Sequence, residues 1–395
     1  MAGMSAPPEE PRSSEKLRLG GVTWWGYNYG SALQAYALRQ VLGGMGVEYE
    51  VLDQYASRRG LFALIGQLGF KKTFRKIWAR IAHPKLAGRS KIFRTFAEKE
   101  LALFGAGRDI GRTNARYDGF VCGSDQIWNP TLVSPDDPLY WLRFAEAGKP
   151  KFAYAPSVGV TEFDGRESAS IRENLKDFGA VSCREQSGTE AINRALGEER
   201  CVTVLDPTLL AGRALWDGMS EERVHPRPYL FAYLLRGTEL RERKIEQFAA
   251  QRGLEILSMP MLEYDNACRY DLKFGHRRLW NATPAEFVSA VRHAEFVVTD
   301  SFHCTAFSCM YHREFSVFPK MGNPQLTRIG DLQRMLGLPQ RFIGDDTPAE
   351  DIPSGQPFDW EHADAALRAQ REFSMRYLSD AVEAVRLIVR GERKA

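Results

Sequence analysis

The 395-residue chain has few of the features that mark metal-binding, secreted or membrane proteins. Its six cysteines include no Cys-x-x-Cys pair, and its seven histidines include no pair at metal-ligand spacing. We therefore expect no metal site, and we interpret the cysteines as small buried side chains in a reducing compartment. No segment approaches the roughly 20 apolar residues that a membrane-spanning helix requires. The sequence thus predicts a cytoplasmic protein.

Net charge is low as well, and the start of the chain has no apolar segment. Lys and Arg exceed Asp and Glu by only three, so the composition predicts no nucleic-acid partner. Residues 1–19 contain three prolines and no apolar core, unlike a signal peptide. We expect these 19 residues to form a disordered leader.

The order of the predicted elements indicates an α/β protein with two domains, which the length also favours. A strand at 20–25, a helix after Gly30 and a strand at 48–52 form a βαβ unit, which requires parallel strands. We place the first domain at 20–223, and Pro226 and Pro228 suggest a linker after it. Further strands are predicted at 120–122, 152–155, 180–183 and 202–205, and then at 229–234, 254–259, 296–299 and 315–318.

The second half repeats this alternation of strands and helices, which places a second domain at 229–345. A long amphipathic helix follows it, within residues 360–395. The helices expected between the strands of the second domain lie at 238–252, 283–294, 302–312 and 327–337.

Two polar loops follow strands of the first domain, at the sheet edge where α/β proteins bind ligands. In the first, Asn28 and Tyr29 offer groups suited to a sugar, and Ser31 could cap the next helix. The alternative is an ordinary turn with a helix cap.

The second loop places Asp125 where a carboxyl group is best positioned for proton transfer, with Gln126 and Asn129 as candidate substrate contacts. The alternative is an Asx turn with Trp128 packed inside. The two interpretations stay open at this point.

Two further strand ends carry charged or titratable side chains. Arg184 suits a planar anion, because its guanidinium can bind a carboxylate or phosphate through two hydrogen bonds, although it could instead pair with Glu185. Asp206 has the same position after a strand, where we favour a structural helix cap.

The sharpest candidate is the segment at 297–304, where a β-branched strand changes into a helix. Asp300 or Ser301 is the expected N-cap, and the free N–H groups behind it form a natural anion site. His303 lies in the first helical turn, where the helix dipole disfavours the imidazolium, so we interpret it as a candidate acid or base.

Together these segments resemble the polysaccharide pyruvyl transferase family, from about residue 20 to about residue 340. No single stretch would suffice, but their order and spacing are specific. The stretches that carry the resemblance are NYGS at 28–31, LQAYAL at 33–38, GSDQIWNP at 123–130, RE at 184–185 with Gly188, DPTLL at 206–210 with Trp216, and TDSFH at 299–303.

The resemblance implies two Rossmann-like domains facing a cleft, as in GT-B glycosyltransferases, with the C-terminal helix packing back on the first domain. It also implies transfer of a pyruvyl group from phosphoenolpyruvate to two hydroxyls of a sugar or lipid-linked oligosaccharide, giving a cyclic ketal without any cofactor. Arg184 matches a family position that contacts the donor, and His303 matches the histidine of an Arg-x-His motif.

The chain departs from that motif, since Ser301 stands where members with demonstrated transfer usually have Arg. The missing guanidinium removes a charged hydrogen bond worth about 1.5–3 kcal/mol, so another cation must serve the donor or the donor differs. Arg236 and Arg328 are the candidate replacements. The alternatives are a nucleotide-sugar glycosyltransferase on the same fold and an inert glycan-binding member.

Residues 54–97 hold eleven Lys or Arg and no Asp or Glu, which concentrates the positive charge of the chain. Apolar residues recur at helical spacing at 70–81, with basic residues on the other face. The pattern predicts a basic amphipathic helix within a basic helical segment at 58–97. The helix either packs on the first domain or rests on an anionic surface at the inner face of the membrane.

Overall fold

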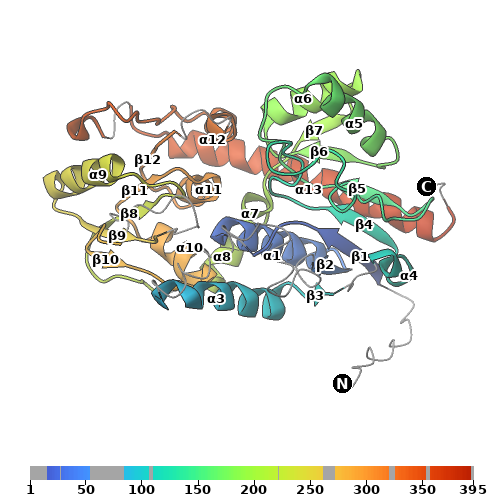
Figure 1. The fold of residues 1–395 in the computed structure, drawn as a ribbon, viewed down its shortest axis with the longest axis horizontal. Coiled ribbons are helices and arrows are strands. Elements are labelled where there is room, and N and C mark those ends of the chain that lie inside the picture. The colour runs from blue at the N-terminus through green and yellow to red at the C-terminus, as the bar shows by residue number, and fades with distance from the viewer. Residues whose placement is uncertain are drawn as a thin grey trace, which may run out of the picture.

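The computed structural model describes residues 16–26, 28–53, 84–105, 110–220, 222–260, 272–319, 325–352 and 356–392. Within them, two five-stranded sheets and one strand pair are covered by helices (Figure 1). Each half of the chain builds one of the two large sheets, and every strand pairing is parallel. The chain is therefore an α/β protein, as the sequence predicted.

The N-terminal half forms a sheet with the strand order β3-β2-β1-β4-β5. The direction of winding changes between β1 and β4, and the carboxyl ends of such strands open a crevice for ligands. The strands are β1 (Leu17–Val22), β2 (Val47–Leu52), β3 (Leu103–Phe104), β4 (Gly119–Cys122) and β5 (Lys151–Ala153), and the helices are α1 (Tyr29–Gly44), α3 (Pro84–Glu100), η2 (Ile110–Arg112) and α4 (Thr113–Arg116).

A strand pair extends this half, because a parallel bridge between Phe152 and Ala180 joins it to β5. α5 begins with a reciprocal capping box made by Asp164 and Glu167, and the carboxylate of Asp206 caps α7. The elements here are β6 (Val181–Cys183), β7 (Cys201–Thr203), α5 (Gly165–Leu175), α6 (Gln186–Leu196), α7 (Pro207–Leu210) and α8 (Arg213–Met219).

The second half repeats the topology with the order β10-β9-β8-β11-β12, so its winding changes between β8 and β11. Its central strands are fully buried, which explains their continuous apolar runs. The elements are β8 (Tyr229–Tyr233), β9 (Glu255–Ser258), β10 (Arg277–Arg278), β11 (Phe296–Thr299), β12 (Phe315–Val317), α9 (Glu239–Gln251), α10 (Pro284–Arg292), α11 (Phe302–Met310), α12 (Gln325–Met335) and η3 (Ala349–Asp351).

The last helix, α13 (Trp360–Val389), runs from the second half back across the first (Figure 1). The Tyr377 hydroxyl donates to the Ala153 carbonyl at 2.8 Å, and the Ser374 hydroxyl accepts from the Leu205 N–H at 2.9 Å. Near its end, Arg386 donates to the Met45 carbonyl at 2.6 Å. These contacts confirm that the C-terminal helix packs on the first domain.

The first strand differs from expectation at its N-terminal end. β1 begins at Leu17 rather than at residue 20, because Leu17 and Leu19 are buried and the strand pairs with β2 from Leu17 onward. The last three residues of the predicted leader are therefore part of the sheet. Residues 1–15 lie outside the described part of the chain.

The basic amphipathic helix predicted at 70–81 also lies outside the described residues. Of the same basic segment, α3 is described, and two of its arginines bind the protein itself. Arg89 donates to the carbonyls of Pro260 and Trp280 in the second half, and Arg94 pairs with Asp53 at 3.0 Å. In the described part of the chain, no helix combines the length and apolar character needed to cross a membrane.

Candidate active site

Side chains that follow four different strands converge between the two halves of the molecule. Asp125 follows β4, Arg184 follows β6, and Asp206 follows β7, all in the first half. His303 follows β11 in the second half. All four are almost completely buried, with exposed fractions of 6% or less. Asp125, Arg184 and His303, which the sequence offered as separate strand-end candidates, therefore lie close together in the structure.

Asp206 is the anionic centre of the cluster. Its Oδ1 accepts from the N–H and hydroxyl of Thr208, as expected of a helix cap, while its Oδ2 accepts from Ser124 Oγ and Arg184 Nη1, both at 2.9 Å. Burial alone would raise the pKa of this carboxyl, but His303 and Arg184 together hold it well below its usual range. Asp206 is thus an ionised group that no proton transfer at neutral pH would neutralise.

His303 stands against this carboxylate from the other half of the molecule. Its Nε2 lies 3.4 Å from Asp206 Oδ2 and 3.4 Å from Arg184 Nη1. The ring also abuts Gly30, where a Cβ would come within 2.0 Å of His303 Nδ1. His303 does not face solvent, because the start of α11 packs against the start of α1 and leaves only 6% of the residue exposed.

Asp125 adopts a left-handed backbone conformation with φ of 76°. Such a conformation is uncommon for a residue other than glycine and is typical of functional sites. Its Oδ2 accepts from Ser31 Oγ at 2.8 Å, its Oδ1 accepts from the Gln126 N–H at 2.9 Å, and Arg184 Nη2 lies 3.6 Å from Oδ1. Asp125 itself makes no Asx turn, because its Oδ1 binds the N–H of the next residue; the Asx turn of this loop is at Asn129, whose Oδ1 accepts from the Thr131 N–H, and Trp128 is buried as that alternative expected.

The Arg184 guanidinium lies among three carboxylates, those of Asp206, Asp125 and Glu185. Burial opposes its charge, but these three anions more than compensate and raise its pKa. Its Nε and Nη2 atoms nevertheless have no hydrogen-bond partner among the described residues. Its Cζ lies 4.5 Å from the centroid of the Phe302 ring, which supports the guanidinium plane.

Arg328, on α12 of the second half, brings a second guanidinium to the same place. Burial and then repulsion by Arg184 lower the pKa of Arg328 to about 10, and Glu185 and Asp125 oppose that shift. Its Nε also lacks a hydrogen-bond partner within the described residues. Two buried cations with unsatisfied N–H groups make an arrangement suited to an anion.

The structure gives other roles to several predicted site residues. Asn28 caps α1 by accepting from the Ser31 N–H, so Ser31 is not the cap. Tyr29 is not open to a sugar, because its ring is fully buried and stacks on Phe287 across the interface, 5.0 Å between centroids. Its hydroxyl donates to the carbonyl of Ala282. Tyr29 thus connects the two halves.

Gln126 and Asn129 are engaged with each other, since Asn129 Nδ2 donates to Gln126 Oε1 at 2.9 Å. The Asn129 Oδ1 also accepts from the N–H and hydroxyl of Thr131. The Asn129 amide therefore stabilises its own loop.

The polar groups after β11 hold the backbone in place. Asp300 accepts from the N–H groups of Leu235 and Arg236, at 2.6 and 3.0 Å. Ser301 is the N-cap of α11 and accepts from the Cys304 N–H. The side chain of Arg236 is exposed rather than buried with Arg184, so of the two candidate replacements for the missing arginine, only Arg328 lies in the cluster.

Two residues of the candidate active site, Glu185 and Asp206, were not singled out as site residues from the sequence. Glu185 was considered only as a partner of Arg184, yet its Oε1 accepts from Ser157 Oγ and from the N–H groups of Val158 and Gly159. Asp206 was assigned to capping alone, although it binds both Arg184 and Ser124. Its position after a strand, already shared with Arg184, was the available signal.

Comparison with known proteins gives both a family and a fold. The family model for polysaccharide pyruvyl transferases matches residues 28–319. A search of curated proteins found no match. Among solved structures, UDP-N-acetylglucosamine 2-epimerase from Rickettsia bellii is similar with a TM-score of 0.54 and 10% identity, over 94% of this chain and 99% of that chain.

The UDP-N-acetylglucosamine 2-epimerase from Methanocaldococcus jannaschii is similar with a TM-score of 0.50 and 11% identity, over 91% of this chain and 99% of that chain. At such low identity these likenesses concern the fold alone. They confirm the predicted architecture of two Rossmann-like domains facing a cleft in the GT-B manner.

Proposed function

The chain belongs to the polysaccharide pyruvyl transferase family, and from this premise we propose that it transfers the pyruvyl group of phosphoenolpyruvate onto two hydroxyls of a glycan sugar. The product is a cyclic ketal, and inorganic phosphate leaves. The observation that carries the proposal is the pair of buried guanidiniums, Arg184 and Arg328, which have N–H groups without partners among the described residues and come from opposite halves of the molecule.

Phosphoenolpyruvate presents a carboxylate and a phosphate on a small planar core. Arg184 is supplied by the first domain and Arg328 by the second, so an anion between them would relieve their mutual repulsion. Arg328 thereby takes the role of the arginine that the family motif usually has at position 301. Ser301 remains a helix cap, which a serine suits.

His303 is the proposed acid and Asp125 the proposed base. The first sugar hydroxyl loses its proton to Asp125 and attacks C2 of the donor, while His303 delivers a proton to C3, so the methylene becomes a methyl group. The second hydroxyl then loses its proton to His303, which gave up its own proton to C3, and displaces phosphate from C2 to close the ketal. The proton held by Asp125 leaves with the phosphate, so both side chains return to their starting forms. Asp206 keeps the imidazole oriented and stabilises its charged form, and Ser31 holds the Asp125 carboxylate.

Release of phosphate from phosphoenolpyruvate in the presence of acceptor sugars is the deciding experiment. We expect release to depend on an acceptor with two neighbouring hydroxyls and to be lost with His303→Gln. Release of a nucleotide from a nucleotide-sugar, with none of phosphate from phosphoenolpyruvate, would instead support a glycosyltransferase. The proposed place of action is the cytoplasm, with a sugar or lipid-linked oligosaccharide as acceptor.

A further inference from the structure

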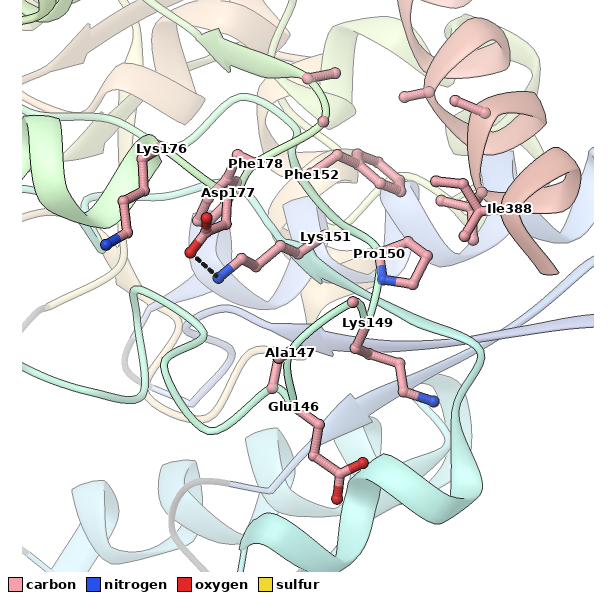
Figure 2. A pocket seen from close by; sticks show the side chains of 17 residues that line it. Glu146, Ala147, Lys149, Pro150, Lys151, Phe152, Lys176, Asp177, Phe178 and Ile388 are labelled. Atoms are coloured by element: carbon pink, nitrogen blue, oxygen red, sulfur yellow. Dashed lines mark ion pairs between the residues drawn. The ribbon is translucent and has the colours of Figure 1, made fainter. Parts of the chain in front are cut away.

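A cavity of about 440 Å³ lies on the side of the first domain away from the candidate active site. It opens at the amino ends of β5 and β6, between the loops 145–150 and 176–180 and the C-terminal half of α13 (Figure 2). The catalytic candidates of this domain, Asp125 and Arg184, follow the carboxyl ends of its strands. The cavity is therefore separate from the site of transfer, and its volume is within the range of small-molecule pockets.

One wall of the cavity is apolar. α13 contributes Ala381, Ala384, Val385 and Ile388, which recur at intervals of three and four and therefore share one face of the helix. Opposite them, Phe152 and Phe178 add aromatic surface (Figure 2). The residues that line this wall carry no polar side-chain group, so it suits a hydrocarbon or aromatic body.

The opposite side carries a cation that is only weakly paired. Lys151 begins β5, its side chain is 12% exposed, and its ammonium lies 3.9 Å from the Asp177 carboxylate, beyond hydrogen-bond distance. The same ammonium lies 5.4 Å from the centroid of the Phe178 ring. Burial lowers the pKa of Lys151, although Asp177 acts in the opposite direction. A carboxylate or phosphate at this point would complete the hydrogen bonding of the ammonium.

The remaining charges of the cavity favour an anion as well. Lys149 and Lys176 accompany Lys151, against Glu146 and Asp177, so the lining carries one more cation than anions. Lys149 is already committed, since its ammonium donates to the Tyr117 carbonyl at 2.9 Å, and Lys176 binds Glu173 at the exposed rim. Lys151 is thus the cation most available to a ligand.

We propose that this cavity binds an amphipathic organic monoanion, with its apolar body on the α13 wall and its carboxylate or phosphate at Lys151. The ligand is distinct from the donor and the acceptor, because the cavity opens at the opposite edge of the sheet from the catalytic side chains. β5 runs from Lys151 toward Ser157, which binds Glu185 beside Arg184. An occupant would therefore contact the chain that supports the site of transfer.

Titration calorimetry with sodium decanoate below its micelle concentration tests the proposal on the full chain. We expect one saturable site, at least tenfold weaker binding of neutral decanol, and no binding of decylamine. Lys151→Met should weaken decanoate at least tenfold without changing decanol, and Ala384→Phe should abolish both by filling the cavity. The matched control is Lys99→Met, which removes a lysine that is 79% exposed elsewhere.

A second arm distinguishes a free amphiphile from a bilayer lipid. Cosedimentation with phosphatidylglycerol vesicles is measured for the same variants, and the arm that responds to Lys151→Met and Ala384→Phe identifies the source of the anion. If neither arm responds to these two substitutions, or if Lys99→Met has the same effect as Lys151→Met, the cavity is not a binding site. The readout does not depend on catalysis, so the proposal can fail while the proposed transfer stands.

Discussion

The sharpest prediction concerns a contact that ties the two domains together beside the candidate site. Helix α6 has no side-chain cap from its own N-cap residue, Glu185. Instead, the Asp331 carboxylate of α12 accepts from the N–H and the hydroxyl of Ser187, at 3.0 and 2.6 Å. Asp331 is 5% exposed and lies one helical turn after Arg328. The contact therefore fixes the Arg328 helix against the segment that carries Arg184.

Asp331→Ala should loosen the closed arrangement of the domains by about 1 kcal/mol, the usual cost of losing a helix cap. The two guanidiniums then spend less time together, so we expect donor binding to weaken about fivefold, together with a lower melting temperature. Asp331→Asn should restore most of the affinity, because an amide oxygen still caps a helix. Calorimetric titration of phosphoenolpyruvate gives the affinity, and thermal unfolding gives the stability.

Arg334→Ala is the matched control, since Arg334 is exposed and pairs with the other oxygen of Asp331. The Arg334 side chain is 57% exposed, so solvent screens its charge and donor affinity should stay close to the wild-type value. The reasoning is refuted if Asp331→Ala lowers the melting temperature but leaves donor affinity within twofold of wild type. In that event the contact would serve stability alone.

Three other expectations concern the cluster, and a fourth concerns the basic segment 58–97. His303→Ala should abolish turnover with the fold retained, as circular dichroism can show, and more than a tenth of the wild-type rate at saturating donor would exclude the acid role. Gly30→Ala should impair turnover strongly through contact with the His303 ring, whereas the same change at Gly43, where a Cβ meets nothing within 4 Å, should be harmless. Arg184→Lys should weaken donor binding at least tenfold although it keeps the charge, and unchanged affinity would leave only an ion-pair role. Binding of the chain to anionic vesicles through the basic segment 58–97 should fall steeply with salt, and equal, negligible sedimentation in every condition would eliminate the membrane role.

The local structure was largely readable from the sequence because it depends on neighbours in the chain. The strand at Phe296–Thr299 was predicted with its bounds, since a β-branched run ends there at two cap-forming residues. At the ends of other elements, the predicted bounds differ from the observed ones by one to three residues. In β1 this is because pairing with a distant strand, β2, sets where the strand begins. The family motifs also named the strand ends at which Asp125, Arg184 and His303 stand.

What the sequence could not supply were the contacts between distant segments. Arg184 meets His303 across 119 positions and Ser187 meets Asp331 across 144, and no local pattern encodes such pairs. Tyr29 was misjudged for this reason, because its partner Phe287 belongs to the other domain. Tyr29 has a side chain that could bind a sugar, but its burial at the interface makes it a packing residue instead.

The charges of the cluster suggest why a histidine stands at its centre. Arg184 and Arg328 contribute two positive charges, and Asp125, Glu185 and Asp206 contribute three negative ones, so a neutral His303 leaves one negative charge in excess. An incoming anionic donor adds to that excess in a buried place where charge is costly. The positive charge that the proposed acid, His303, carries to the reaction would offset it. On this argument, His303→Gln, which has no charged form, should weaken binding of phosphoenolpyruvate more than binding of an analogue that lacks the phosphate, which calorimetry can measure, and equal weakening would separate the histidine from the donor charge.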